Sequence, residues 1–251
     1  MHLTDQTTPS KLTSQRLTPY AESRLLMAVL ASRAPLPSSA LFIGLAEDGL
    51  PVLLNLRDHA PSPVLVAADA GAGKTRLLQT VARAIEHIHD PERVRFAVVT
   101  EHPNEWSTFE CSSHCEGILA FHHALTTAYF ASTMQGRWPA SSSSASLVLL
   151  IDGFEMLSTD GDLRDAAHRF LQAPPPPGIL PLVTLNTSGA STPSAWLDAF
   201  RVRLFGYVRE RAVAASLCES ADSFPGGLQP PYQFAAREDS AWLPFWVPEM
   251  D

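Results

Sequence analysis

The 251-residue sequence has few cysteines, almost no lysine and no long apolar run. Its three cysteines, Cys111, Cys115 and Cys218, are too few for a disulfide framework, so we expect free thiols in a reducing compartment. No apolar stretch reaches the roughly 18 residues that a membrane-spanning helix needs, and the polar N-terminus has no secretion signal. These absences predict a cytoplasmic protein with no membrane span.

Positive charge is also scarce, with 18 Lys and Arg against 26 Asp and Glu and a net charge of −8. Proteins that grip DNA through its phosphates usually carry a basic stripe, but the arginines here are scattered. The charge therefore does not support nucleic acid as a partner, although a ring of subunits can concentrate a few arginines in a pore. The composition, 45% hydrophobic and 18% charged, is that of a globular chain.

The order of apolar segments predicts an α/β fold. Residues 1–20 are rich in Thr, Ser, Gln and Pro and are expected to form a flexible tail, with a single domain over residues 21–251. Two apolar runs, 41–45 and 51–54, are joined by an acidic turn and predict an N-terminal β-hairpin. Fully apolar strands then alternate with helices, which indicates a mostly parallel central sheet covered on both faces.

Two further segments have specific predictions. Residues 116–134 are expected to be helical. Residues 232–247 are expected to form two short strands, and Pro244 and Pro248 limit these strands to an edge of the sheet.

The strongest motif follows the apolar strand over 64–67 and opens a helix. Gly71 and Gly73 permit backbone conformations closed to residues with a Cβ, so successive N–H groups can hold phosphate oxygens at the helix N-terminus. Lys74 is expected to bind the β- and γ-phosphates, and Thr75 to offer its hydroxyl to magnesium. Ala68 stands where the usual pattern has Gly. The predicted nucleotide-binding residues are Asp69, Ala70, Gly71, Ala72, Gly73, Lys74, Thr75 and Arg76.

A second motif is the apolar strand over 147–151, which ends in Asp152. This is the Walker B pattern, in which Asp152 would hold the magnesium ion opposite Thr75. Many related enzymes place the water-activating Glu directly after this Asp, but the sequence has Gly153 there. Glu155 and Glu101, the latter after the strand over 94–100, are alternative bases, and solvated loop carboxylates are the competing interpretation.

Polar residues at two other strands complete the candidate site. Asn186 follows the strand over 180–185 and is expected beside the γ-phosphate, with Thr184 as second candidate. Arg203 lies in an arginine-rich span and could complete the site of a neighbouring subunit. Surface arginines beside a strand explain the same pattern.

With these motifs in place, the chain resembles the FtsK/HerA-like branch of the additional-strand P-loop ATPases. The resemblance rests on the Walker segments, the aromatic segment 242–248, and a hairpin Ile43-Gly44-Leu45-Ala46-Glu47-Asp48-Gly49-Leu50-Pro51-Val52 before the phosphate loop. It implies a three-layer RecA-like P-loop NTPase with an N-terminal β-hairpin and C-terminal edge strands. It also implies ATP and Mg²⁺ as cofactors, and often a hexameric ring. Ala68 and Gly153 are departures that mark a degenerate member.

The function expected from the sequence is an ATP-binding protein with weak or partner-dependent ATPase activity, which couples nucleotide state to assembly or movement of a larger complex. We expect a homo-oligomer or a subunit of such a complex. The alternative is a non-hydrolysing structural or adaptor subunit, favoured by Gly153. A third hypothesis, a DNA translocase subunit, requires basic pore loops that the sequence does not show.

Overall fold

The computed structural model describes residues 25–33, 35–57, 62–121, 145–158, 175–188, 197–218, 227–238 and 241–251, with short helical pieces at 126, 128–129, 132–133, 165–167 and 169–170. The expected tail over 1–20 lies outside them, so the division into tail and single domain stays a prediction. The named elements are α1 (Leu26–Arg33), β1 (Ala40–Ala46), β2 (Pro51–Asn55), β3 (Val64–Ala68), α2 (Lys74–Ile88), β4 (Val94–Thr100), η2 (Pro103–Phe109), β5 (Cys115–Ala120), β6 (Ser146–Asp152), η3 (Phe154–Ser158), β7 (Ile179–Asn186), β8 (Val202–Phe205), α6 (Arg211–Cys218), β9 (Gln233–Glu238) and β10 (Ala241–Trp246).

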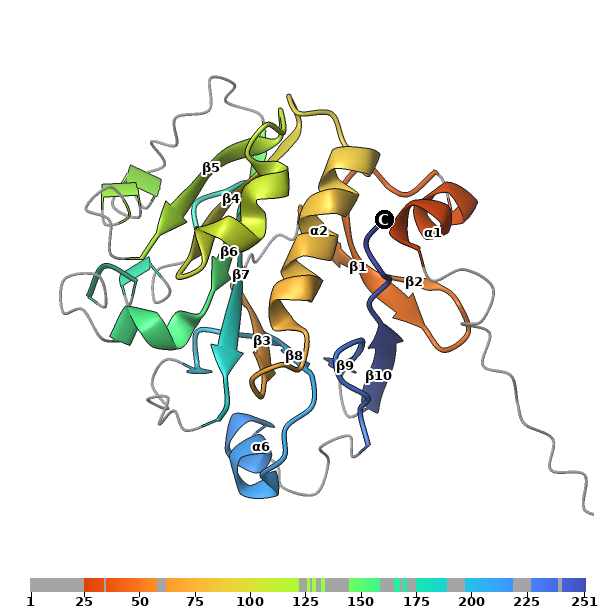
Figure 1. The fold of residues 1–251 in the computed structure, drawn as a ribbon, viewed down its shortest axis with the longest axis vertical. Helices are drawn as coiled ribbons and strands as arrows, with labels where there is room; N and C mark the ends of the chain where they lie inside the picture. Colours follow the sequence, from red (N-terminus) through yellow and green to blue (C-terminus); the bar gives the residue numbers. More distant parts are fainter. Residues whose placement is uncertain are drawn as a thin grey trace, which may run out of the picture.

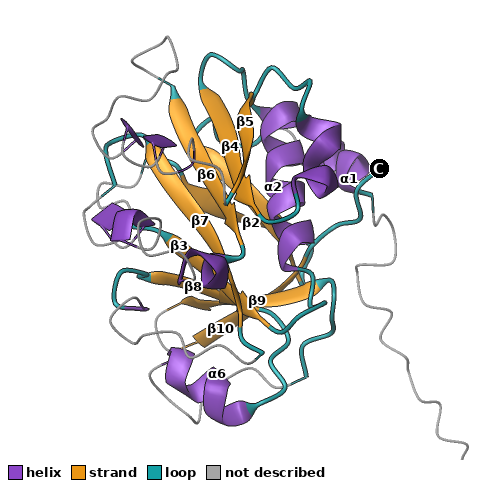
Figure 2. Cartoon of the chain, turned by 60° about the vertical axis from the view of Figure 1, so that its left-hand side comes forward, coloured by secondary structure: helices purple, strands orange, loops and turns teal. Residues whose placement is uncertain are grey.

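All described strands form one ten-stranded sheet in the order β2-β1-β10-β9-β8-β3-β7-β6-β4-β5 (Figure 1). The six strands from β8 to β5 run parallel, whereas β2, β1, β10 and β9 pair antiparallel. Helices lie on both faces of the sheet (Figure 2). The expected three-layer α/β fold with a mostly parallel sheet is confirmed.

The central strands are apolar throughout because both faces of the sheet are covered. In β3, Val64 and Val66 pack into one hydrophobic core with α2, while Leu65 and Ala67 pack into a second core on the opposite face. Successive side chains of a strand point to opposite faces, so only a continuous apolar run can fill both cores. This double burial fixes the end of β3, from which the phosphate loop begins.

Helix α2 is held on the sheet by one apolar face. Leu77, Leu78, Val81 and Ile85 recur at helical spacing and are all buried. Its N-terminus, beginning at Lys74, therefore lies in a fixed place beside the carboxyl end of β3.

The C-terminal strands are not at an edge of the sheet, so this part of the prediction is wrong. Strand β10 lies between β9 and β1, and the edge strands are β2 and β5. Proline is tolerated because β10 pairs with β1 only at Phe245 and Trp246, after Pro244. The missing N–H of Pro244 therefore interrupts no ladder on that side.

The helix predicted over residues 116–134 is also partly wrong. Residues Cys115–Ala120 form β5, which extends the sheet in parallel beside β4, and the helical residues that the structure describes in this stretch are 126, 128–129 and 132–133. Gly117 disfavours a helix interior and the β-branched Ile118 suits a strand, and pairing with β4 decided a segment whose local pattern was ambiguous.

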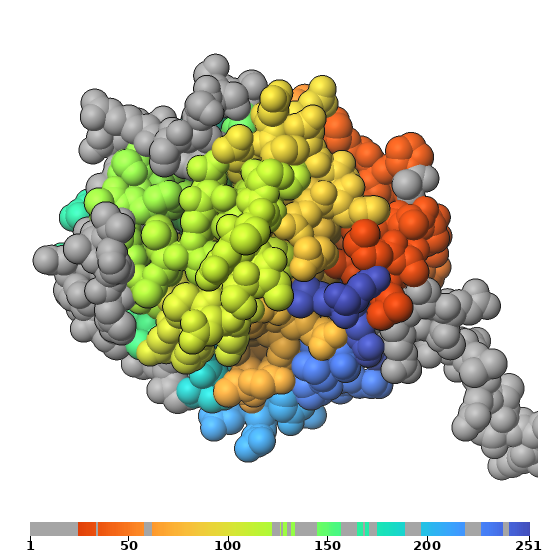
Figure 3. Space-filling model, turned by 45° about the horizontal axis from the view of Figure 1, so that its top comes forward, coloured from red at the N-terminus to blue at the C-terminus, as the bar shows by residue number. Residues whose placement is uncertain are grey.

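The N-terminal hairpin is confirmed, since β1 and β2 pair antiparallel from Ala40 opposite Asn55 to Leu45 opposite Pro51. The end of the chain packs against α1: the N–H of Leu26 donates to the carbonyl of Glu249 at 2.8 Å, and the C-terminal residues lie beside α1 in Figure 3. Among the helices that the structure describes, none is both long and apolar enough to cross a bilayer.

Candidate functional site

Lys74 reaches back over the phosphate loop. Its ammonium donates to the carbonyl oxygens of Ala68 at 3.0 Å and Asp69 at 2.9 Å, so the loop closes around the positive charge. Burial lowers the pKa of Lys74, and the carboxylates of Glu155, Asp152 and Asp69 oppose this shift. These carboxylates come from two segments of the chain, the phosphate loop and the turn from β6 into η3, and all three act on the same ammonium.

Gly73 is required by both conformation and space. Its φ is +92°, in the left-handed region, and a Cβ there would lie 1.9 Å from the carbonyl oxygen of Pro231. A side chain would therefore strain the backbone and displace the segment that precedes β9. The C-terminal part of the chain thus packs directly on the phosphate loop.

Ala68 is accommodated without strain. It is the last residue of β3, fully buried, in extended backbone that any residue can adopt. Space for its methyl group comes from Gly206, where an added Cβ would lie 2.9 Å from the Cβ of Ala68. The departure from the usual Gly is therefore matched by a glycine on the neighbouring strand end.

We expect Gly206→Ala to destabilise the protein by about 1–3 kcal/mol, the range for overpacking a filled core. The added methyl would press on Ala68 and, at 2.9 Å, on the ring of Phe234. Urea denaturation of the native chain and of Gly206→Ala would measure the difference in the free energy of unfolding. Combining Ala68→Gly with Gly206→Ala should recover the part of this loss that comes from the clash with Ala68, while the clash with the ring of Phe234 remains. If the effects of the two substitutions on the free energy of unfolding simply add, the two sites do not interact.

Asp152 ends β6 beside α2, as the Walker B interpretation requires. Its carboxylate accepts hydrogen bonds from the hydroxyls of Thr75 and Thr184, the latter at 3.0 Å. Burial raises the pKa of Asp152, the nearby carboxylate of Glu105 adds to the rise, and the two hydroxyls only partly offset it. Thr184 was the second candidate for the γ-phosphate side; in the structure it is buried and orients Asp152.

Gly153 explains why no Glu follows Asp152. Its φ is +105°, and its N–H donates to the hydroxyl of Thr184 at 2.8 Å. A Glu in this left-handed conformation would be strained. The turn continues into η3 and brings Glu155 towards Lys74, where its Oε2 accepts the Asn186 N–H at 3.0 Å.

The two candidate bases differ in their surroundings: the carboxylate of Glu155 accepts a hydrogen bond from the end of β7, whereas the side chain of Glu101 is exposed. Glu101 follows β4, next to Thr100, which pairs with Asp152, but its side chain is exposed. The Asn186 side chain turns back to accept the Ser188 N–H at 3.1 Å, while its backbone meets Glu155.

Glu105 was missed by sequence reasoning. It lies in η2, whose Trp106 and Phe109 are buried, and its carbonyl accepts a hydrogen bond from Gln79 of α2 at 2.9 Å. An exposed Glu five residues after a strand has no distinguishing local pattern. Only the packing of η2 on α2 places it near Asp152.

The two predicted arginines differ in their surroundings. The guanidinium of Arg76 lies over the ring of Tyr232 at 4.5 Å, and its Nε is buried without a hydrogen-bond partner among the described residues. Arg203 donates to the backbone carbonyls of Phe200, Leu197 and Leu217, which indicates a structural role. It lines a separate cavity with Arg201 and Arg237.

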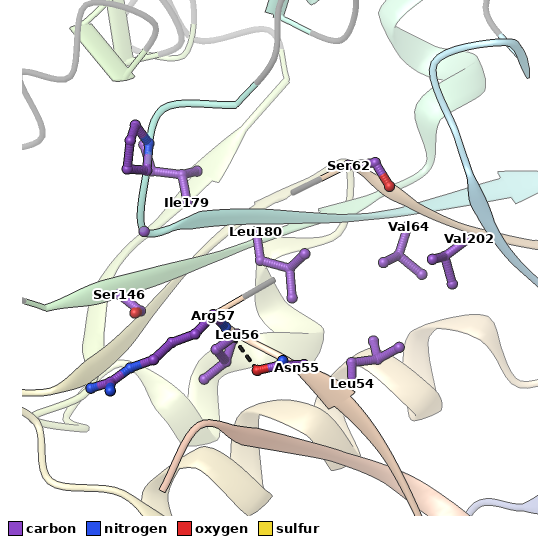
Figure 4. A pocket seen from close by; sticks show the side chains of 12 residues that line it. Leu54, Asn55, Leu56, Arg57, Ser62, Val64, Ser146, Ile179, Leu180 and Val202 are labelled. Atoms are coloured by element: carbon purple, nitrogen blue, oxygen red, sulfur yellow. Dashed lines mark hydrogen bonds between the residues drawn. The ribbon is translucent and has the colours of Figure 1, made fainter. Parts of the chain in front are cut away.

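A different cavity, of about 380 Å³, lies at the opposite end of the parallel strands (Figure 4). Its lining includes the first residues of four strands, namely Val64, Ser146, Ile179 and Val202. Ligands of open α/β sheets bind beyond the carboxyl ends of the strands. This cavity is therefore not the candidate nucleotide site, which lies at the end of β3 and β6.

No protein-family model matches the sequence, and none of the curated proteins matches it. Solved structures do match the fold. The cytoplasmic domain of the type VII secretion ATPase EccC of Thermomonospora curvata aligns with a TM-score of 0.59 and 17% identity over 88% of this chain. The chain spans only 30% of the length of that structure.

Two smaller proteins have the same fold. The pCW3 conjugation coupling protein TcpA, solved with ATPγS, aligns with a TM-score of 0.58 and 12% identity over 86% of this chain and 67% of its own. The genome packaging NTPase B204 of Sulfolobus turreted icosahedral virus 2, in complex with AMPPCP, aligns with a TM-score of 0.54 and 12% identity. This alignment covers 76% of this chain and 100% of B204. The expected resemblance to FtsK-like, RecA-type P-loop ATPases is confirmed at the level of the fold.

Proposed function

We propose that this chain binds ATP with Mg²⁺ and is a weak or partner-dependent ATPase that couples nucleotide state to the assembly or movement of a larger complex. The observation that supports it most is the loop closed around Lys74, whose ammonium also feels the carboxylates of Asp69, Asp152 and Glu155 from two segments of the chain. An isolated buried ammonium is costly, and phosphate oxygens would complete its coordination.

The residues present fit both cofactors. Two N–H bonds of Lys74 donate to loop carbonyls, which leaves a third for a phosphate oxygen. Thr75 and Asp152 supply a hydroxyl and a carboxylate, the hard oxygen ligands that Mg²⁺ prefers. Bound Mg²⁺ would neutralise charge on the phosphates. Thr184 would orient Asp152, and we propose that Glu155, bonded to the Asn186 N–H, accepts a proton from water.

The similar structures include a secretion ATPase, a conjugation coupling protein and a genome packaging NTPase. On that ground we propose that this chain, too, works as a homo-oligomer or as a subunit of a complex that moves or assembles a macromolecule.

Calorimetric titration of the native chain with ATP and Mg²⁺, followed by phosphate release in the same sample, tests the proposal. Binding with turnover supports an ATPase. Binding without turnover, even at high protein concentration, favours the second candidate, a nucleotide-binding adaptor. The left-handed turn at Gly153, which excludes the usual Glu, is the specific observation for that candidate. Absence of binding rejects the proposed function and favours a structural subunit that keeps only the fold.

If the chain hydrolyses ATP, we expect Glu155→Gln to lower phosphate release by about 100-fold or more, the typical contribution of a general base. ATP affinity should be kept, because the amide oxygen can still accept the Asn186 N–H. Glu101→Gln is the matched control and should leave turnover unchanged, since its side chain is exposed. The opposite result would assign the base to Glu101.

A further inference from the structure

Asp69, the second residue of the phosphate loop, joins three segments of the chain. Its Oδ1 accepts a hydrogen bond from the hydroxyl of Thr187, just after β7, and its Oδ2 accepts the backbone N–H of Arg209 at 2.9 Å, just before α6. Its own N–H donates to the carbonyl of Tyr207 at 2.9 Å. A side chain that only faced solvent at a loop tip would not make the contacts with Thr187 and Arg209.

The carboxylate is held in its ionised form. Burial alone would raise the pKa of Asp69, but the hydrogen bonds from Thr187, the Arg209 backbone and Ser188 outweigh it and keep the pKa below its ordinary value. Both carboxylate oxygens are thus used as acceptors at neutral pH.

Two of the three joined segments, the phosphate loop and the end of β7, form the two halves of the candidate site. The carbonyl of Asp69 accepts a hydrogen bond from Lys74, while Thr187 directly follows Asn186, the residue expected beside the γ-phosphate. Apart from Asp69, the described hydrogen bonds between these halves are Thr187 N–H to the Ala68 carbonyl at 3.1 Å and Ala70 N–H to the Ser188 hydroxyl at 3.5 Å. The β3–β7 ladder aligns the two strands as far as Ala68 and Asn186, and the side chain of Asp69 extends this connection past the strand ends, to the loop and Thr187.

We propose that Asp69 is a positioning residue that makes the site prefer a nucleoside triphosphate to a diphosphate. In the proposed binding mode, a diphosphate would contact the loop alone, whereas the terminal phosphate of a triphosphate would also meet the end of β7. A preorganised spacing between the two halves benefits only the ligand that spans both. The inference rests on the proposed ATP binding.

The test is the ratio of the ADP and ATP dissociation constants, measured with Mg²⁺ by calorimetry for the native chain, Asp69→Ala and Thr187→Val. We expect the preference for ATP to fall about tenfold in Asp69→Ala, the scale of one charge-assisted hydrogen bond, and by less in Thr187→Val. Thr187→Val keeps the shape and charge of the site and removes only the hydroxyl.

The sign of the change separates positioning from charge. Removing a carboxylate near a phosphate site should by itself strengthen binding, and more so for the more highly charged ATP. An unchanged or increased preference for ATP in both variants, with melting temperatures showing them folded, would overturn the inference. If Asp69→Ala is unfolded, Thr187→Val alone decides. If the native chain binds neither nucleotide, the proposed function itself fails.

Discussion

Lys74→Met should bind ATP at least about 100-fold more weakly than the native chain, while its melting temperature changes by only a few degrees. The loss of affinity is large because, among the residues that the structure describes, the Lys74 ammonium is the cationic group that the loop encloses. A charge-assisted hydrogen bond to phosphate is about twice as strong as a neutral one, and Met keeps the apolar stem without any donor.

Stability should survive this change because the buried charge is itself unfavourable. Burial lowers the pKa of Lys74, so its charged form is less stable in the folded chain than in water. Removing the charge relieves that desolvation, which offsets the loss of the two bonds to the carbonyls of Ala68 and Asp69. Calorimetry with ATP and Mg²⁺, beside a thermal melt without ligand, measures both effects.

Arg83→Met is the matched control, because Arg83 lies on the same helix and pairs with Glu86 away from the loop. It should leave ATP affinity unchanged. ATP binding by Lys74→Met at native strength would show that the enclosed ammonium is not a phosphate ligand, and the nucleotide-binding proposal would fall with it.

The predictable part of this molecule was the part set by local pattern. The continuous apolar strands, the amphipathic α2 and the motif around Lys74 each carry their own periodicity or spacing, and the structure has them where the sequence places them. Pairing partners have no such local mark. The register of β10 beside β1 and the addition of β5 to the sheet depend on which strands meet in the tertiary structure.

The candidate site divides in the same way. Lys74, Thr75 and Asp152 could be named from motifs, but the choice between Glu101 and Glu155 could not, because it depends on the left-handed turn at Gly153. Glu105 lies near Asp152 only through the packing of η2, for which no motif exists.

In metal-free buffer at neutral pH, Asp152→Asn should be more stable than the native chain, with a melting temperature roughly 2–4 °C higher for each kcal/mol gained. Burial raises the pKa of this carboxyl above its unfolded value of 3.8, so ionisation costs more in the folded chain than in the unfolded one. The amide carries no charge, and its oxygen can still accept the hydrogen bond from Thr184.

The stability difference between Asp152→Asn and the native chain should depend on pH. A raised pKa means that the folded state binds its proton more tightly, so the native chain loses stability as pH rises from below 3.8 through the folded value. The advantage of Asp152→Asn should therefore be absent at acidic pH and fully present at neutral pH. Asp198→Asn, an exposed control, should show no such advantage at either pH.

Adding ATP and Mg²⁺ should reverse the order. A ligand that binds only the folded chain stabilises it in proportion to the logarithm of its concentration over its dissociation constant. The native chain, with the carboxylate available to Mg²⁺, should gain more than Asp152→Asn, and phosphate release should fall by about 100-fold or more in the variant. Equal gains in both chains would mean that Asp152 does not hold the metal. Metal binding would then no longer explain why the protein keeps a buried carboxylate that lowers its stability.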